Sequence, residues 1–437
     1  MLISKCYNRT LTHVVSGSRN YRDVHEPVTT VDSTIQSAVA KLADMELSEM
    51  VSTLIYLPRK RMGLGVLQAC GLVAEAQIIA SQKVHVNYLS TNHPELYILV
   101  NETNYYTELN LGDSGDIADL TGIDAVTMAT LTAANVKGIM KKGLDTAYRA
   151  IGDALLVKLG ADVNTRGQAA YLQSAKNSLV ATMFLDSGIN RVSAEYITRE
   201  GYKALLRRHF GASPINHEPA FRDCECGHNY STAENKTHPE TCKNNQGLVN
   251  IRHNDLRDEL LRLIRQFHPR AVAGAITHEQ TVGLYSRPGA NGGPDIVAGV
   301  RADIVFKEGA VKHIIDLAVV TPSAKCYLDP PVNSYLHQDK AAMKQEMVKR
   351  RKYGQVNRDR EGNPNFSIPP NSVIPFVFEC TGGLSPSALI FLNHICGVHT
   401  YKRSLFLSNC AMICSRYSSK MMVATRNRYH AQPQNGG

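Results

Sequence analysis

Apolar residues recur at helical spacing from residue 30 to residue 56, before a break at Pro58. This period predicts a helix with one apolar face. The apolar positions include Ile35, Val39, Leu42 and Leu47. The next run, LPRKRMGLGV, is basic, and its Gly63 and Gly65 permit a tight turn. The small-residue run GLVAEAQIIASQ then predicts a further helix, so two helices flank a basic glycine turn.

The middle of the chain is helical in pattern after a polar stretch. Residues 90–125 are rich in Asn and Thr without a firm period, so we expect an exposed connection there. Residues 134–210 are rich in Ala and Leu and contain no proline, which predicts several consecutive helices. The run DLRDELLRLIRQF predicts another, amphipathic helix. Its apolar face carries Leu256, Leu260, Leu263 and Phe267.

The hydrophobic period changes after residue 300. The runs RADIVF and HIIDLAVV are typical of strands, and the charged turn KEGAVK between them predicts a hairpin. A helix, a proline-rich loop, the strand IPFVFE and the helix PSALIFLNHIC follow. The sequence therefore predicts an α+β fold, with an all-helical N-terminal region and a C-terminal α/β core.

Composition and charge narrow the class of protein. A chain of 437 residues with 43% hydrophobic and 20% charged residues has the make-up of a globular protein of two or three domains. The formal net charge is +9, and no acidic residue follows Glu379, which favours a polyanionic partner. The basic residues beyond it are Lys402, Arg403, Arg416, Lys420, Arg426 and Arg428. Apolar runs are too short for a membrane span and the start lacks a signal-peptide core, so we expect an intracellular protein without a membrane anchor.

Four potential metal ligands lie close together in a C-x-C-x11-H-x3-C pattern. They are Cys224, Cys226, His238 and Cys242. Such a set can close a tetrahedral Zn²⁺ site, and Gly227 allows the backbone to turn around the metal. Surface thiols beside an unrelated histidine are the alternative, and His228 is a rival ligand. Four protein ligands without an open position predict a structural zinc knuckle rather than a catalytic centre.

A second group of cysteines and histidines lies near the C-terminus. It comprises Cys380, Cys396, Cys410, Cys414, His394 and His399. These residues belong to apolar runs such as ALIFLNHIC and NCAMIC, where thiols behave as small hydrophobic side chains. We therefore predict buried thiols and no second metal site.

Two aspartates interrupt the predicted hairpin. Asp303 lies in RADIVF and Asp316 in HIIDLAVV, and an unpaired carboxylate in such a run is costly to bury. Placed across a hairpin, the two could share one or two Mg²⁺ ions that polarise a phosphodiester and activate water. A solvated sheet face is the alternative for both residues.

The segment HQDKAAMKQEMVKRRKYG predicts a basic helix after the hairpin. Its cations are Lys340, Lys344, Lys349, Arg350, Arg351 and Lys352. A solvated basic face is the default explanation. Near a metal site, however, a lysine would hold the attacking water and offset transition-state charge, and the other cations could hold flanking phosphates.

The order of these motifs resembles the C-terminal part of site-specific non-LTR retrotransposon proteins that carry a restriction-like endonuclease. The succession is a zinc knuckle, RHN at residues 252–254, R-x-D, twelve residues, a second Asp, and K-x-x-K-Y. In that pattern Asp303 and Asp316 match the carboxylates, and Lys349 matches a lysine displaced onto the next helix. Lys352 and Tyr353 complete the local motif. The run LPRKRMGLGV with the helix after it resembles the polymerase thumb of these elements.

The resemblance covers about residues 30–85 and 220–385, with some departures. Ala302 stands where the family has proline, and the knuckle spacer is longer than usual. Ala318 occupies the usual position of the nuclease lysine, so catalysis would depend on Lys349, with Lys325 as the fallback. No YADD-like polymerase motif is found, so we expect the C-terminal portion of a longer element protein or a truncated genomic copy.

The resemblance implies a Mg²⁺-dependent endonuclease that nicks target DNA, so that the exposed 3′-hydroxyl primes reverse transcription by a linked upstream polymerase. Asp303 and Asp316 would hold Mg²⁺, Lys349 would position water or stabilise charge, and Lys352 and Tyr353 would support it. The implied partners are target DNA and element RNA, and the implied location is the nucleus. A catalytically dead nucleic-acid-binding remnant is the main alternative, and a free-standing restriction or repair nuclease ranks last.

The expected divisions follow from the same reasoning. They are a thumb-like helical segment at 1–90, a helical linker at 91–215, a zinc knuckle at 216–248, a restriction-like endonuclease at 249–400 and a basic tail at 401–437.

Overall fold

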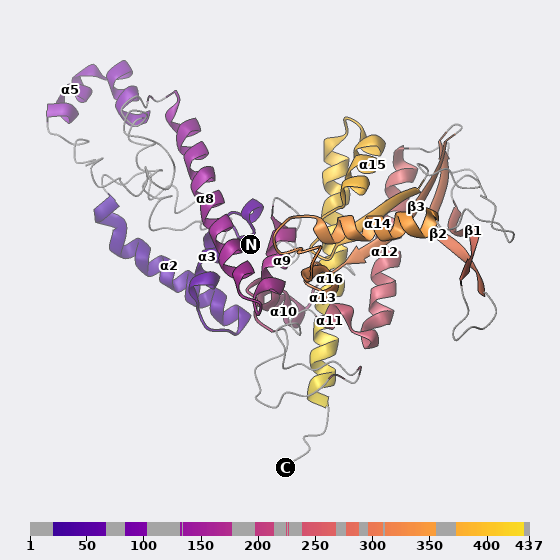
Figure 1. The fold of residues 1–437 in the computed structure, drawn as a ribbon. Coiled ribbons are helices and arrows are strands. Elements are labelled where there is room, and N and C mark those ends of the chain that lie inside the picture. The colour runs from indigo at the N-terminus through magenta and orange to yellow at the C-terminus, as the bar shows by residue number, and fades with distance from the viewer. Residues whose placement is uncertain are drawn as a thin grey trace, which may run out of the picture. The chain divides into compact units, whose positions relative to one another are not determined.

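The chain is mostly helical, with one small mixed sheet in its C-terminal half (Figure 1). A computed structural model describes residues 21–66, 84–102, 132, 134–176, 197–213, 224, 226, 238–267, 277–287, 296–308, 311–354 and 373–431. Two compact units divide the chain, Met1–Lys158 and Leu159–Gly437. This agrees with the α+β fold expected from the sequence, with helices before the sheet.

The regular elements of the first unit that the structure describes are all helices. Its elements are α2 (Tyr21–Ala43), α3 (Glu49–Tyr56), the 3-10 turn η2 (Arg59–Arg61), α5 (Pro94–Glu102) and most of α8 (Val136–Ala161). The helix predicted over residues 30–56 is thus two helices, because Asp44 has a φ of 52° and Ser48 caps α3. Ile35 and Val39 are buried as expected, but Leu42 and Leu47 are exposed.

Helix α5 corrects one expectation. Residues 90–125 were expected to form an exposed connection, yet residues 94–102 are helical. Pro94 is suited to the first position of a helix, and the apolar run LYILV follows two residues later. The polar residues around this run hid its helical pattern from the sequence prediction. Residues 84–92, which overlap the start of that stretch, are helical as well, whereas residues 103–125 and the helix expected over GLVAEAQIIASQ lie outside the described residues.

The basic glycine turn forms as predicted. Gly65 has a φ of +71°, and the chain folds back so that the Leu64 N–H donates to the Leu54 carbonyl at 2.8 Å. Gly63 packs so closely on α3 that a Cβ there would lie 1.7 Å from the Leu57 carbonyl oxygen. Asp145 of α8 pairs with Lys60 and, at 3.3 Å, with Arg61, so part of the turn's charge is neutralised.

Replacing Gly63 by alanine is expected to destabilise the first unit by about 3 kcal/mol, because the methyl group would overlap backbone that cannot move aside. Urea unfolding checks this through the midpoint of the transition. The control is Gly138→Ala in α8, where a Cβ meets nothing within 4 Å and the midpoint should stay the same or rise. Equal midpoints for the two variants would contradict the assigned packing.

The second unit surrounds the sheet with helices. After the end of α8 come α9 (Arg166–Ala175), α10 (Arg199–His209), α11 (His238–Thr241), η7 (Lys243–Asn245), α12 (Gln246–Phe267), α13 (Lys325–Leu328), α14 (Lys340–Gly354), α15 (Pro386–Cys396) and α16 (Thr400–Ala431). The several helices predicted between residues 134 and 210 are confirmed as α8, α9 and α10 in the described part.

The sheet has the strand order β1-β2-β3-β4. Its strands are β1 (Thr277–Arg287), β2 (Ile296–Glu308), β3 (Val311–Val320) and β4 (Val373–Glu379). The predicted hairpin is confirmed, because consecutive strands β2 and β3 pair antiparallel as far as Glu308 opposite Val311. Strand β4 joins β3 in parallel after the α13–α14 connection, and β1 is an additional antiparallel strand that the sequence pattern did not predict.

Helices cover both faces of the sheet. On one face, Leu256 and Leu260 of α12 share a fully buried core with Phe306 and Phe376 of the strands and Phe406 of α16. On the other face, α14 packs against β3 and β4 through small side chains. The cysteines at 380, 396, 410 and 414 are all buried, as expected. Those at 396, 410 and 414 join the apolar core, whereas Cys380 accepts a hydrogen bond from Arg208 at 2.9 Å.

Helix α16 occupies the segment expected to be a basic tail. Several of its cations are used in packing rather than left for a partner. Arg416 donates to Asp255 at 2.6 Å, Arg426 to Glu200 at 2.7 Å and Arg428 to the Asn245 side-chain oxygen at 2.6 Å. None of the helices in the described part of the chain combines the length and apolar character that a membrane span requires.

Candidate functional site

The predicted zinc ligands converge. The ligand atoms of Cys224, Cys226, His238 and Cys242 all lie within 4.8 Å of one another. The Cys224 and Cys242 sulfurs are 3.7 Å apart, and the Cys226 sulfur is 3.4 Å from His238 Nε2. A disulfide would need about 2.05 Å, whereas tetrahedral Zn–S bonds of about 2.3 Å place two sulfurs about 3.8 Å apart. The four atoms therefore fit a structural zinc site, and the rival His228 lies outside the described residues.

The charge of the cluster also suits a cation. Burial raises the pKa of Cys242 to about 12, so without a metal the thiol stays protonated at neutral pH. A bound Zn²⁺ would replace the proton and neutralise the thiolate, which is the usual exchange at cysteine zinc sites. Cys224, Cys242 and His238 are buried, as expected for a site that holds a structure together.

The cluster is fixed to two other helices of the unit. Glu240 of α11 forms an ion pair with Arg208 of α10 at 2.7 Å, and both side chains are almost fully buried. The Ser418 hydroxyl of α16 donates to the same Glu240 carboxylate. Just beyond the last ligand, the Asn245 amide donates to Pro239 and Met421 carbonyls. Residues 238–245 thus connect α10 and α16 to the start of α12 through these hydrogen bonds and this ion pair.

The two predicted carboxylates lie where β2 and β3 cease to pair. The ladder runs from Glu308–Val311 to Ile304–Ile315, so Asp303 and Asp316 follow on the two strands at the same level. In a regular strand the side chains of residues 302 and 304 would lie on the same face of the sheet. Here Ala302 packs with Val305, whereas Ile304 belongs to the core between the sheet and α12, so β2 is irregular at this point. This irregularity lets Asp303 reach the backbone of β3, where its carboxylate accepts the Leu317 N–H at 2.6 Å.

Helix α14 brings its lysines to Asp316. Ala342, Glu346, Lys349 and Tyr353 recur at three- and four-residue spacing, so they share the helix face that meets the sheet. The Glu346 carboxylate fixes this face by accepting the N–H of Ser387 at the start of α15 at 2.8 Å. The K-x-x-K-Y spacing thereby directs Lys349 and Tyr353 toward the strands.

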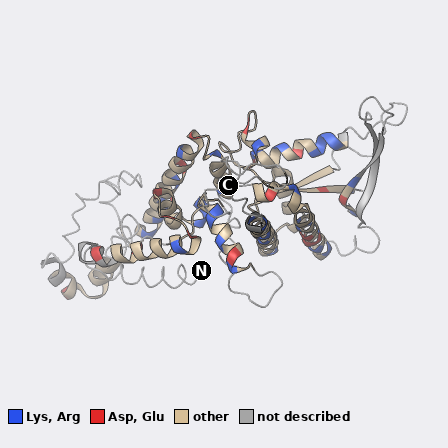
Figure 2. Cartoon of the chain, turned by 90° about the horizontal axis from the view of Figure 1, so that it is seen from below, with Lys and Arg blue, Asp and Glu red and all other residues tan. Residues whose placement is uncertain are grey.

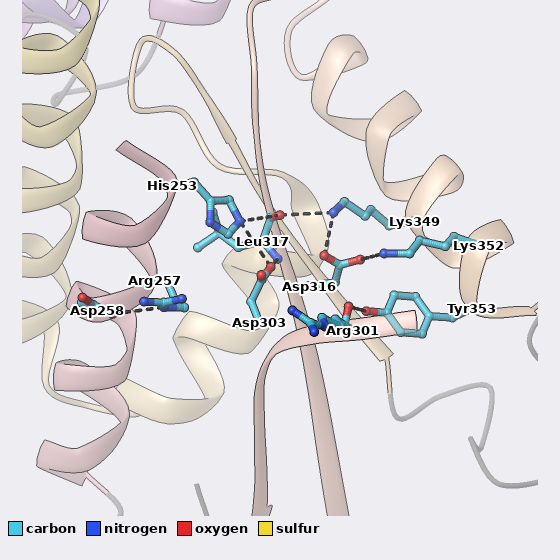
Figure 3. A network of polar contacts seen from close by, with 10 residues as sticks. All are labelled: His253, Arg257, Asp258, Arg301, Asp303, Asp316, Leu317, Lys349, Lys352 and Tyr353. Atoms are coloured by element: carbon cyan, nitrogen blue, oxygen red, sulfur yellow. Dashed lines mark hydrogen bonds and ion pairs between the residues drawn. The ribbon is translucent and has the colours of Figure 1, made fainter. Parts of the chain in front are cut away.

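Asp316 is 3% exposed and is held by two ammonium groups. Lys349 Nζ donates to Asp316 Oδ1 at 2.6 Å, and Lys352 Nζ lies 3.4 Å from Oδ2. Lys349 Nζ also donates to the Leu317 carbonyl at 3.2 Å (Figure 3). One ammonium group therefore contacts both a carboxylate oxygen and the adjacent backbone oxygen.

Asp303 meets a residue for which the sequence had suggested no role. His253 Nε2 of α12 lies 3.4 Å from Asp303 Oδ2. Burial by itself raises the pKa of Asp303, but the hydrogen bond and charge of His253, the Leu317 N–H and Lys349 together outweigh it and lower the pKa. The contact also changes the pKa of His253. Burial lowers this pKa, but the hydrogen bond and the negative charge of Asp303 raise it by more, so the net shift is upward.

The structure thus gathers Asp303, Asp316, Lys349 and Lys352 around one backbone position, Leu317. Tyr353 lies beside them, where its hydroxyl donates to the Arg301 carbonyl at 3.1 Å, and burial followed by the Asp316 charge raises its pKa. The fallback Lys325 is exposed at the start of α13.

Sequence reasoning missed the Leu317 carbonyl and His253. A backbone oxygen leaves no sequence signal, and the RHN motif that contains His253 entered only as part of the resemblance.

Comparisons with known proteins do not assign the chain to a family. No protein-family model matches it, and a search of curated proteins found no match.

Proposed function

We propose that this chain is a Mg²⁺-dependent DNA endonuclease of the kind found in non-LTR retrotransposon proteins. The observation that carries the proposal is the position of Lys349 Nζ, which contacts both Asp316 Oδ1 and the Leu317 carbonyl. Asp303 binds the N–H of the same Leu317. Two carboxylates, a backbone oxygen and a lysine thus lie together where the two central strands of the sheet cease to pair, and such a set can support hydrolysis of a phosphodiester.

The donor atoms suit Mg²⁺. Asp303, Asp316 and the Leu317 carbonyl offer only oxygen, the ligand type that Mg²⁺ prefers. A bound Mg²⁺ would polarise the phosphodiester and lower the pKa of a water molecule. Lys349 would hold the attacking water and offset charge that develops on the phosphoryl oxygens, and Lys352 would limit the charge of the buried Asp316.

Helix α14 offers a surface for the DNA backbone. Lysine and arginine positions form blue bands along this helix, next to the sheet (Figure 2). Arg350 and Arg351 are exposed. The helix carries six basic residues and a single acidic one, Glu346. Cations that border a hydrolytic site would neutralise flanking phosphates and align the scissile bond.

The remaining parts fit the same proposal. The nicked strand would offer its 3′-hydroxyl to a linked upstream polymerase that copies element RNA, and the protein would then act in the nucleus. The basic glycine turn of the first unit would belong to the polymerase thumb, and the zinc knuckle would hold the helices that flank the nuclease site.

Nicking of supercoiled plasmid DNA tests the proposal. The full chain should nick DNA with Mg²⁺ or Mn²⁺ and not with EDTA, and Asp316→Asn should remove the activity because it takes away the negative charge that both lysines surround. The matched control is Asp258→Asn, an exposed carboxylate on α12 whose neighbour is Arg257. Equal nicking by wild type and Asp316→Asn would refute the proposal.

One observation favours a second function, that of a catalytically dead nucleic-acid-binding remnant. Both oxygens of Asp316 already have lysine partners, so the network could serve as a buried ion-pair cluster. This function predicts strongly salt-dependent DNA binding, no cleavage with any divalent cation, and affinity that is unchanged or higher when Asp303 is neutralised.

A further inference from the structure

His253 is placed on the sheet side of α12. Arg252, Leu256 and Leu260 of this helix are buried, so the helix is fixed against the core. His253 lies beside this buried row and is partly exposed, and its ring points toward Asp303 and Leu317 (Figure 3). The histidine therefore approaches the carboxylates from the face opposite to α14.

A single ring nitrogen meets two of the proposed metal ligands. His253 Nε2 lies 3.4 Å from Asp303 Oδ2 and 3.3 Å from the Leu317 carbonyl oxygen. Ligands at right angles on a metal with bonds of about 2.1 Å are about 3 Å apart, so these separations are close to those of neighbouring ligands. Nε2 is thus within reach of a cation that Asp303 and the Leu317 carbonyl would bind.

We propose that His253 is a direct ligand of the catalytic metal through Nε2, which gives the site one nitrogen beside its oxygen donors; this inference rests on the proposed nuclease function. The side chain of Asn254 also hydrogen-bonds to His253 and would help to orient the ring, as outer partners of metal-bound histidines do.

A nitrogen ligand has a consequence for metal choice. Mg²⁺ favours oxygen donors, whereas imidazole binds first-row transition metals better, and Mn²⁺ accepts both. The wild-type site should therefore bind Mn²⁺ more tightly than Mg²⁺. His253→Gln should raise the Kd for Mn²⁺ at least about tenfold and change the Kd for Mg²⁺ less. His253→Asp, which restores an oxygen donor, should move the preference toward Mg²⁺.

The test is a spectroscopic one on the zinc-loaded full chain with Mn²⁺ as the probe. Electron spin-echo measurements should detect ¹⁴N coupling from an imidazole bound to Mn²⁺, and His253→Gln should remove that coupling. His337→Gln, which alters an exposed histidine, is the matched control and should leave it intact. A histidine that only holds Asp303 in place would give no ¹⁴N coupling in the wild type, and that result would overturn the inference.

The failures of the two proposals can be told apart. If wild type nicks DNA and Asp316→Asn does not, but bound Mn²⁺ shows no nitrogen coupling, the nuclease stands and the role of His253 falls. If nitrogen coupling is present and lost in His253→Gln, but no divalent cation supports cleavage, the metal ligand stands and the nuclease falls.

Discussion

Replacing Lys349 by alanine is expected to lower the rate of metal-dependent nicking about 10²–10³-fold, as loss of a preorganised charge-stabilising group does at other active sites. The reason is its position, since Nζ contacts Asp316 Oδ1 at 2.6 Å and the Leu317 carbonyl at 3.2 Å. The side chain is 16% exposed, so its charge acts where water screens it weakly. Single-turnover nicking of a supercoiled plasmid at saturating Mg²⁺ measures the effect.

Two lysines of the same helix are controls for this result. Lys352 lies 3.4 Å from Asp316, but its side chain is 41% exposed, so Lys352→Ala should cost less than tenfold. Lys344 donates to the Cys326 carbonyl, away from Asp316, and Lys344→Ala should leave the rate nearly unchanged. If Lys349→Ala retained full activity while Lys325→Ala lost it, the lysine would be the fallback residue and the proposed chemistry of α14 would be wrong.

The strands β2 and β3 and the basic helix α14 could be predicted because their sequence patterns match the positions that they take in the folded chain. RADIVF and HIIDLAVV alternate or run apolar as sheet strands do, and a charged turn with one glycine sets the hairpin. Asp303 and Asp316 drew attention for a physical reason, since a carboxylate in an apolar strand needs a partner. Those partners are Lys349, Lys352 and His253.

Other parts depend on contacts that no local pattern carries. The predicted basic tail is a 32-residue helix whose cysteines enter the core and whose arginines meet Asp255 and Glu200, residues more than 150 positions away. The role of His253 follows from the irregularity of β2 near Asp303 and from the placement of α12 against the sheet. Side-chain direction at an irregular strand cannot be obtained from a period of two.

Replacing Cys242 by serine is expected to release zinc and to lower the unfolding midpoint of the second unit by roughly 10 °C, for a loss of about 4 kcal/mol. Cys242 is 2% exposed, and its sulfur lies 3.7 Å from that of Cys224, so its loss removes one of four converging ligands. Metal analysis of the purified chain should give one zinc in wild type and little in the variant. Cys326→Ser is the control, because that exposed thiol lies outside the cluster.

Zinc loss should also disturb the proposed nuclease site, because the last zinc ligand lies close in sequence to α12. Cys242 directly precedes η7, and α12 begins after it at Gln246. His253 lies about two turns into α12. Without the metal, Asn245 would lose the fixed knuckle backbone that it now joins to α16, and the first turns of α12 would shift against the sheet. Nicking by Cys242→Ser should therefore fall at a temperature where the variant is still folded, while the Lys349–Asp316 pair is unchanged. A variant that keeps its zinc, or one that loses zinc with the same midpoint and nicking rate, would show that the four residues do not hold these helices.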